Sequence, residues 1–234
     1  MTALDQHQTE TARAVAEFYD RVLVPSLRAH PEYARLLACA PGERVGDFGC
    51  GQSLFYDALR EQSPPPTFLD YSLNALRSID YGLRVRADLH HLPLRSGVYD
   101  RIACIGVLHH LPDRDRVLRE MARVLRPGGQ LVLGVYAARS LQSALRGLHE
   151  LSKSRLWRRT LLGGTEVLLR TRYRLAGHPI PARDARLRAQ DFLEVPYVRY
   201  VPPETYVEQA RAAGFVLVEK RRIAGMNILV LQRG

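Results

Sequence analysis

The chain alternates short apolar runs with segments whose apolar residues recur every three or four positions, a pattern typical of α/β proteins. Apolar residues at helical spacing predict a helix over residues 114–125, which the Pro127-Gly128-Gly129 turn should end, and a further helix is expected over residues 54–60 after a glycine turn. Strands that alternate with helices in this way predict a doubly wound, parallel sheet. The runs that predict its strands lie at residues 44–48, 67–70, 83–87, 101–106 and 130–136.

The first predicted strand ends in the sequence Asp47-Phe48-Gly49-Cys50-Gly51, which turns on two glycines. Glycine tolerates positive φ and lets a ligand approach the backbone closely. A loop at the carboxyl end of a strand is also where open α/β sheets bind ligands. A dinucleotide fingerprint would need a small residue where Leu54 stands, and an acid at 47 suits a pyrophosphate poorly. The loop favours a cationic ligand such as S-adenosylmethionine (SAM), which carries a sulfonium and an ammonium group.

A second acid, Asp70, ends the second predicted strand, 21 residues after Gly49. An acid at this place hydrogen-bonds ribose hydroxyls, and the spacing suits NAD and SAM equally. A third acid, Asp88, follows the third predicted strand.

Three further stretches, residues 92–100, 107–111 and 123–129, resemble the class I SAM-dependent methyltransferases. With the glycine loop and Asp70, the resemblance covers about residues 40–136. It implies a Rossmann-like, seven-stranded sheet whose last strand is antiparallel, with residues 215–221 and 226–231 as the final pair. It also implies SAM as the cofactor, no metal, and the following cofactor-binding residues: Tyr19, Asp47, Gly49, Cys50, Gly51, Asp70, Tyr71, Asp88, Leu89, Ile105 and Gly106.

Within that set, the resemblance assigns the glycine loop to the methionine end, Asp70 to the ribose, and Asp88 with Leu89 to the adenine. It divides the chain into an N-terminal helical lid (1–40), a SAM-binding core (41–136), a helical insert over the substrate (137–200) and a C-terminal part that completes the core (201–234). Tyr19 in the lid would contact SAM; the alternative is that it only packs.

The net charge of +10 is unevenly distributed. Residues 1–136 hold 16 arginines and 16 acids, whereas residues 137–200 hold 12 arginines, one lysine and 5 acids, a surplus of +8. Helical spacing places Arg155, Arg158 and Arg159 on one face, and Arg170 beside Arg174. The surplus indicates an anionic substrate, such as RNA or an acidic metabolite. The alternative is a solvated basic surface.

A narrower resemblance concerns residues 190–197 with Arg199 and Tyr200, which are similar to the tRNA wobble-uridine carboxymethyl methyltransferases, whose insert is also basic. Many methyltransferases of small molecules share the sheet motifs equally well. We therefore expect methyl transfer to an O, N or C atom of a small metabolite or natural product, anionic or neutral. An RNA (tRNA) methyltransferase is the alternative, and a non-catalytic SAM-binding protein is a remote one.

The residues after the fourth predicted strand limit the kinds of methyl transfer that we expect. No N-P-P-Y, D-P-P-Y or Pro-Cys motif follows it, and Cys50 and Cys104 lie at positions typical of structural thiols. Direct transfer from the sulfonium is therefore expected. A hydroxyl acceptor needs a base, and His109 and His110 are the catalytic candidates because the histidine pKa is near 6.5. Since adjacent side chains rarely point the same way, we expect one of them to be structural.

No apolar run reaches 18 residues, and the N-terminus lacks the pattern of a signal peptide. The odd number of cysteines, 3, argues for reduced thiols. We therefore expect a cytoplasmic protein without a membrane partner; its oligomeric state stays open.

Overall fold

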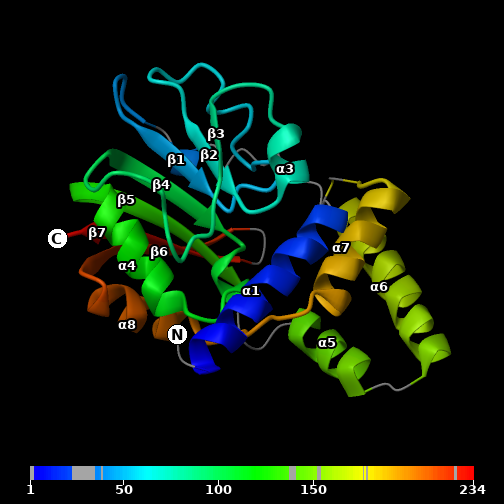
Figure 1. Cartoon of the computed structure of the whole chain (residues 1–234). Coiled ribbons are helices and arrows are strands. Elements are labelled where there is room, and N and C mark those ends of the chain that lie inside the picture. Colours follow the sequence, from blue (N-terminus) through cyan, green and yellow to red (C-terminus); the bar gives the residue numbers. More distant parts are fainter. Residues whose placement is uncertain are drawn as a thin grey trace.

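One twisted seven-stranded sheet organises the fold, and a group of helices lies beside it (Figure 1). The computed structural model describes residues 3–22, 35–37, 39–136, 141–151, 154–175, 177, 179–223 and 226–234. The strand order is β3-β2-β1-β4-β5-β7-β6. Neighbours from β3 to β5 are parallel, and β7 runs antiparallel to both β5 and β6. This confirms the predicted sheet and its antiparallel last strand. The strands are β1 Val45–Phe48, β2 Thr67–Asp70, β3 Leu83–Arg86, β4 Tyr99–Ile105, β5 Leu125–Tyr136, β6 Phe215–Ile223 and β7 Met226–Arg233.

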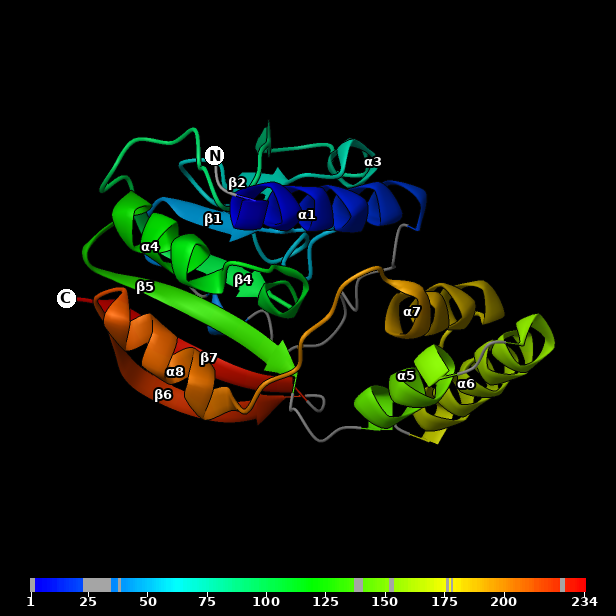
Figure 2. The ribbon, with the colours of Figure 1, turned by 60° about the horizontal axis from the view of Figure 1, so that its bottom comes forward.

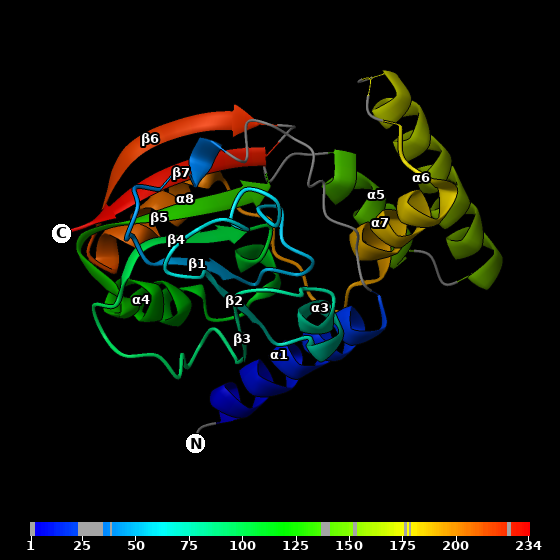
Figure 3. The same ribbon diagram turned by 90° about the horizontal axis from the view of Figure 1, so that it is seen from above.

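The helices fall into two sets, one against the sheet and one beyond it. Figures 2 and 3 show the arrows of β4 and β5 pointing toward the group formed by α5, α6 and α7. The carboxyl ends of the parallel strands, where open sheets bind ligands, therefore face these helices. The helices are α1 Ala3–Arg21, α3 Leu73–Arg77, the 3-10 helix η1 Leu108–His110, α4 Arg114–Val124, α5 Leu141–Leu151, α6 Arg155–Leu175, α7 Ala182–Glu194 and α8 Pro203–Ala212.

Two hydrophobic clusters cover the two faces of the sheet. Leu118, Met121 and Tyr206 from α4 and α8 are fully buried against one face. Phe55 and Leu59 are buried in the cluster on the other face. Central strand β1 is buried along its whole length, which explains why its residues are apolar except for Asp47, one residue before its end.

Helices α5, α6 and α7 pack around a separate small core. Leu162 and Leu169 of α6 meet Ala185, Ala189 and Leu193 of α7 there. Helix α1 joins this group to the sheet, because Val15 and Phe18 are buried against Val195, just after α7. The N-terminal helix thus contacts the insert while running beside the sheet, and Figure 1 shows it crossing the molecule toward α7.

Two local predictions are wrong. Residues 54–60 form a run of turns rather than a helix, because Ser53 takes a positive φ of 57° and burial of Phe55 and Leu59 holds the segment in place. Strand β5 begins at Leu125 rather than at 130, directly after α4, and a register shift between Tyr99 and Arg101 accommodates the Pro-Gly-Gly turn.

Gly49 should be the least replaceable glycine of the loop after β1. It has a φ of +72°, and a Cβ there would lie 2.5 Å from a methyl group of Val107, in the loop after β4. Gly51 has a φ of +52° with open space around it. We expect Gly51→Ala to cost only the strain of positive φ, roughly 1–2 kcal/mol, and Gly49→Ala to cost about 1–3 kcal/mol more from overpacking.

Urea unfolding of the two ligand-free variants measures this difference. Equal losses in the free energy of unfolding would show that Val107 does not pack against the glycine loop.

Candidate functional site

The glycine loop after β1 is tied by hydrogen bonds to the end of β2. The backbone amides of Gly49 and Cys50 both donate to the carbonyl of Leu69, at 2.7 and 3.1 Å. The amide of Gly51 donates to an Asp70 carboxylate oxygen at 2.8 Å. These bonds bend the loop over the carboxyl end of β2 and bring Asp47 and Asp70 close together.

Three carboxylates meet at this edge of the sheet. Asp47 is buried and accepts a hydrogen bond from the Ser53 hydroxyl at 2.7 Å. Asp70 accepts from the amide of Ser72 at 2.8 Å with its other oxygen. Asp20, at the end of α1, accepts from the Ser72 hydroxyl at 2.7 Å. Among the residues that the structure describes, no lysine or arginine forms an ion pair with any of the three.

The carboxylates raise one another's affinity for protons. Burial raises the pKa of Asp47 to about 7, the Ser53 hydrogen bond opposes that rise, and the charge of Asp70 adds to it. Burial also raises the pKa of Asp70, against the amides that bond it, and Asp20 contributes. A buried acid with neighbouring acids and no cation is poised to receive a positively charged ligand.

A hydrogen-bonded cluster links α1, η1 and α7. The Tyr19 hydroxyl lies 2.5 Å from Oδ1 of Asp191 and 2.9 Å from Nε2 of His110. Nδ1 of His110 lies 3.2 Å from the carbonyl oxygen of Tyr197. Tyr19 therefore connects the N-terminal helix to both the sheet and the insert.

The hydrogens of this cluster can be counted. A carbonyl only accepts, so Nδ1 of His110 carries a hydrogen. The Tyr19 hydroxyl has one hydrogen, which the geometry directs to Asp191, the nearer of its two partners. Burial lowers the pKa of His110, which Asp191 and Tyr197 oppose, and burial followed by Asp191 raises that of Tyr19.

His109 lies among aromatic rings. Its ring stacks on Tyr200 with centres 5.5 Å apart, and Tyr136 meets it edge-on at 5.1 Å. Its buried Nδ1 has no hydrogen-bond partner. Burial lowers the pKa of His109 well below its ordinary value, and His110 adds to the effect. The expectation that the two histidines point apart is wrong, since their ring centres lie 4.0 Å apart. They differ instead in partners, because both ring nitrogens of His110 are engaged.

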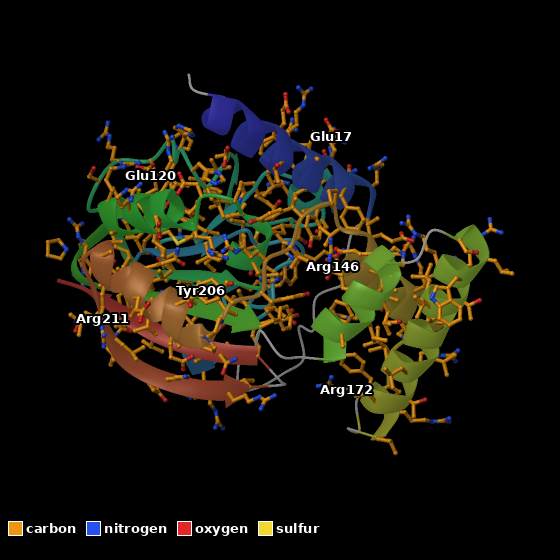
Figure 4. The ribbon with its side chains drawn as sticks, turned by 90° about the horizontal axis from the view of Figure 1, so that it is seen from below. Glu17, Glu120, Arg146, Arg172, Tyr206 and Arg211 are labelled. Carbon is orange, nitrogen blue, oxygen red and sulfur yellow. The ribbon has the colours of Figure 1, made fainter. Side chains whose placement is uncertain are left out.

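A buried guanidinium lies beside this aromatic group. Arg146 of α5 forms an ion pair with Glu150 at 2.6 Å and donates to the Val195 carbonyl at 2.8 Å. Its third nitrogen, Nη1, is buried without a partner. Figure 4 shows Arg146 on the side of the insert helices that faces the sheet. Arg146 also counts among the charges that act on His110 and Tyr200.

The remaining expected cofactor residues line the same edge of the sheet. Asp88 follows β3 and bonds both the amide and the ring of His90, at 2.9 and 2.6 Å. Ile105 ends β4, and the amide of Gly106 donates to the carbonyl of Gly134 at 2.9 Å. Leu89 is buried, whereas Tyr71, the residue directly after β2, is 39 % exposed.

The thiols have no visible part in the chemistry. Cys50 and Cys104 are buried, and burial, followed by nearby carboxylates, raises the pKa of both. A buried thiol with a raised pKa is a poor nucleophile.

Sequence patterns missed several residues of this site. Asp191 and Tyr200 fall within the narrower resemblance but had no assigned role. Asp20, Tyr136 and Arg146 carry no local signal, since each reaches the site only through the packing of its element.

The match to a known family covers the core of the sheet. Residues 46–133 match the methyltransferase domain family. Among curated proteins, the methyltransferase GfsG of Streptomyces halstedii is 57% identical over 47 residues, 20% of this chain and 17% of that protein. The ubiquinone biosynthesis O-methyltransferase of Xanthomonas campestris is 30% identical over 113 residues, 44% of this chain and 46% of that protein. The chain thus spans less than half the length of either relative.

A solved structure shares the fold across the whole chain. The 1,6-didemethyltoxoflavin-N1-methyltransferase of Burkholderia thailandensis, with bound 1,6-didemethyltoxoflavin and S-adenosylhomocysteine, has a TM-score of 0.60 at 16% identity. The match covers 100% of this chain and 91% of that one. Residues 46–133 of this chain thus match a methyltransferase domain, and the described seven-stranded sheet shares its fold with that solved methyltransferase.

Proposed function

We propose that this protein transfers a methyl group from SAM to a small anionic acceptor. The observation that carries the proposal is the meeting of Asp47, Asp70 and Asp20 over a glycine loop without a paired cation in the described chain. SAM supplies a sulfonium and an ammonium group, which would offset the cost of these buried charges. A dinucleotide would add negative charge and increase that cost.

The residues at the strand ends divide between the parts of SAM. Asp70 accepts from the amides of Gly51, Ser72 and Tyr71, and its two oxygens together offer about four acceptor sites, so room is left for a hydrogen bond from a ribose hydroxyl. Asp88 and Leu89 stand where the adenine would lie, with Tyr71, Ile105 and Gly106 as further contacts. Cys50 contributes through the backbone of the loop. Tyr19 closes α1 over the site through its bonds to His110 and Asp191.

The acceptor would lie among the aromatic rings of Tyr136, Tyr200 and His109, with its negative group on Arg146. The unpartnered Nη1 of Arg146 supports an anion there, because a buried guanidinium nitrogen left unbonded costs free energy. The relatives support a small acceptor: one of them belongs to ubiquinone biosynthesis, and a structure of the same fold holds 1,6-didemethyltoxoflavin.

The reaction itself needs few groups. The acceptor's lone pair forms a bond to the methyl carbon, the carbon–sulfur bond breaks, and its electron pair neutralises the sulfonium. For a hydroxyl acceptor the released proton would go to Nδ1 of His109, the ring nitrogen without a partner. A carboxylate acceptor releases no proton. Holding donor and acceptor in line can supply up to roughly 7–11 kcal/mol.

Removing the ribose acceptor should weaken SAM binding without unfolding the protein. A hydrogen bond to a charged group contributes about 1.5–3 kcal/mol, so Asp70→Ala should raise the Kd of SAM by roughly 10- to 150-fold. Calorimetry measures the Kd of SAM for this variant, and Asp57→Ala, a substitution of an exposed acid, is the matched control. Unchanged affinity would remove Asp70 from the site, and preferential binding of NADH would overturn the assignment of SAM.

Asp47 should lower the stability of the ligand-free protein as pH rises. Its pKa is about 7 in the folded state and about 3.9 in an unfolded chain, so the folded state binds the extra proton between these values. The free energy of unfolding therefore falls as pH rises from about 4 to 7. Asp47→Asn keeps the Ser53 bond and removes this loss, so its stability relative to wild type should grow by a few kcal/mol across that range.

Thermal unfolding at pH 5 and pH 8 tests the sign. The variant should also gain less stability from added SAM than the wild type does. Parallel pH dependences of variant and wild type would show that Asp47 ionises freely.

Kinetic measurements should distinguish the role of His109 from that of His110. If His109 takes the proton, His109→Gln should lower kcat by about 10²–10⁴-fold and leave SAM affinity unchanged. Because burial lowers the pKa of His109, wild-type turnover should stay level above pH 6.5 and fall only at more acidic pH. His110→Gln should instead weaken the closure made through Tyr19.

Release of S-adenosylhomocysteine across a panel of phenols and carboxylates gives the rates, with the exposed His91→Gln as control. Full turnover of His109→Gln on every acceptor would show that no histidine base is needed at this position.

A further inference from the structure

Helix α6 has apolar side chains on two opposite faces. Its inner face packs into the core of the insert through Leu162, Thr165 and Leu169, which are buried. Partly buried Leu161 and Tyr173 join that core. This face accounts for the folding of the helix and leaves the other side of α6 unexplained.

The outer face of α6 carries an exposed apolar stripe. Its residues are separated by three or four positions and so lie along one side of the helix. Leu175 is 84 % exposed, Leu156 76 %, Val167 62 % and Trp157 51 %. The stripe contains no charged residue; its members are Trp157, Thr160, Gly164, Leu168, Thr171 and Leu175, with Leu156 and Val167 beside it.

Arginines border the stripe on both sides. Helical spacing places exposed Arg159, Arg170 and Arg174 on one side of it and exposed Arg172 on the other. The helix has one acid, Glu166, which lies toward the inner face 3.7 Å from Arg186 of α7. The outer surface of α6 is therefore apolar at its centre, positive at both borders and without negative charge.

We propose that the outer face of α6 docks the protein on the surface of an anionic lipid bilayer. A helix with arginines beside a stripe of Trp and Leu lies in the interface plane, with the apolar face among the acyl chains and the guanidinium groups at the lipid phosphates. Figures 2 and 3 both place α6 at the border of the molecule, with α7 on its inner side, so the stripe faces outward.

Two other occupants fit the surface less well. RNA would use the arginines but would leave five exposed aliphatic and aromatic side chains, Leu156, Trp157, Val167, Leu168 and Leu175, against phosphates. A second copy packed on the same stripe would bring the arginine borders together, and like charges repel. A bilayer with anionic headgroups satisfies the apolar centre and the basic borders together.

This docking does not require a segment that crosses the membrane. None of the described helices is long and apolar enough for that. The expectation of no membrane partner rested on the lack of such a segment, which does not bear on a helix that lies on the membrane surface. The proposal is also independent of methyl transfer, because α6 faces away from the site.

The chain's single tryptophan, Trp157, reports on this face directly. Full-length protein is titrated with vesicles of phosphatidylcholine alone or with a quarter phosphatidylglycerol. We expect the Trp157 emission to shift to the blue with the anionic vesicles, to shift much less with the neutral ones, and to return toward its free value in about 0.5 M salt.

Two variants separate the apolar from the electrostatic contribution. Replacing Leu156, Leu168 and Leu175 with Ser keeps the tryptophan, and it should raise the lipid concentration for half-binding by at least about tenfold. The matched control replaces three exposed apolar residues of the sheet, Leu83, Val216 and Val218, with Ser and should bind like wild type.

The electrostatic contribution is tested with a variant in which Arg159, Arg170 and Arg174 are changed to Gln. The matched control changes Arg95, Arg119 and Arg211 to Gln. Figure 4 shows Arg172 of α6 and Arg211 of α8 at opposite ends of the molecule, so the control arginines include one remote from the stripe. Circular dichroism of each variant shows that it is folded.

Three outcomes would overturn the proposal. The emission does not change with anionic vesicles at low salt; or the α6 variants bind like their controls; or the emission shift follows dimerisation or addition of a short RNA in the absence of lipid. The last outcome, followed by sedimentation, would assign the stripe to a second copy or to RNA.

Discussion

Two carboxylates buried beside each other at the end of a parallel sheet are costly unless a cation joins them, and this constraint explains much of the site. Asp47 lies one residue before the end of β1 and Asp70 ends β2, and the amides of the glycine loop between them donate to Leu69 and Asp70. The loop can take this path only because Gly49 fits against Val107 with a positive φ. In the proposed function, binding of a positively charged ligand would recover the stability that the ligand-free protein gives up here.

The second feature of the site is a hydroxyl shared by three helices. Tyr19 bonds His110 and Asp191 at once, so it joins the N-terminal helix, η1 after β4 and α7 of the insert. In the proposed function this contact would hold α1 over the bound cofactor.

The insert presents two different surfaces. Its inner side brings Arg146, Asp191 and Tyr200 to the histidines after β4, where the proposed function would hold the acceptor. Its outer side presents the apolar stripe of α6 with arginine borders. The basic surplus of residues 137–200, which composition alone could not divide, thus includes both a buried guanidinium and exposed arginines.

The sequence by itself determined the strands of the parallel core, the glycine loop and the pair Asp47 and Asp70, because these depend on local periodicity and on turns that only glycine permits. It misplaced the segment 54–60 and the start of β5, where burial and a register shift outweigh local propensity. Only the tertiary structure decided which histidine keeps a free nitrogen, that Asp20 joins the other acids and that Arg146 is buried. These facts depend on contacts between residues far apart in the chain, such as Tyr19 with Asp191, and no local pattern encodes them because packing alone sets those distances.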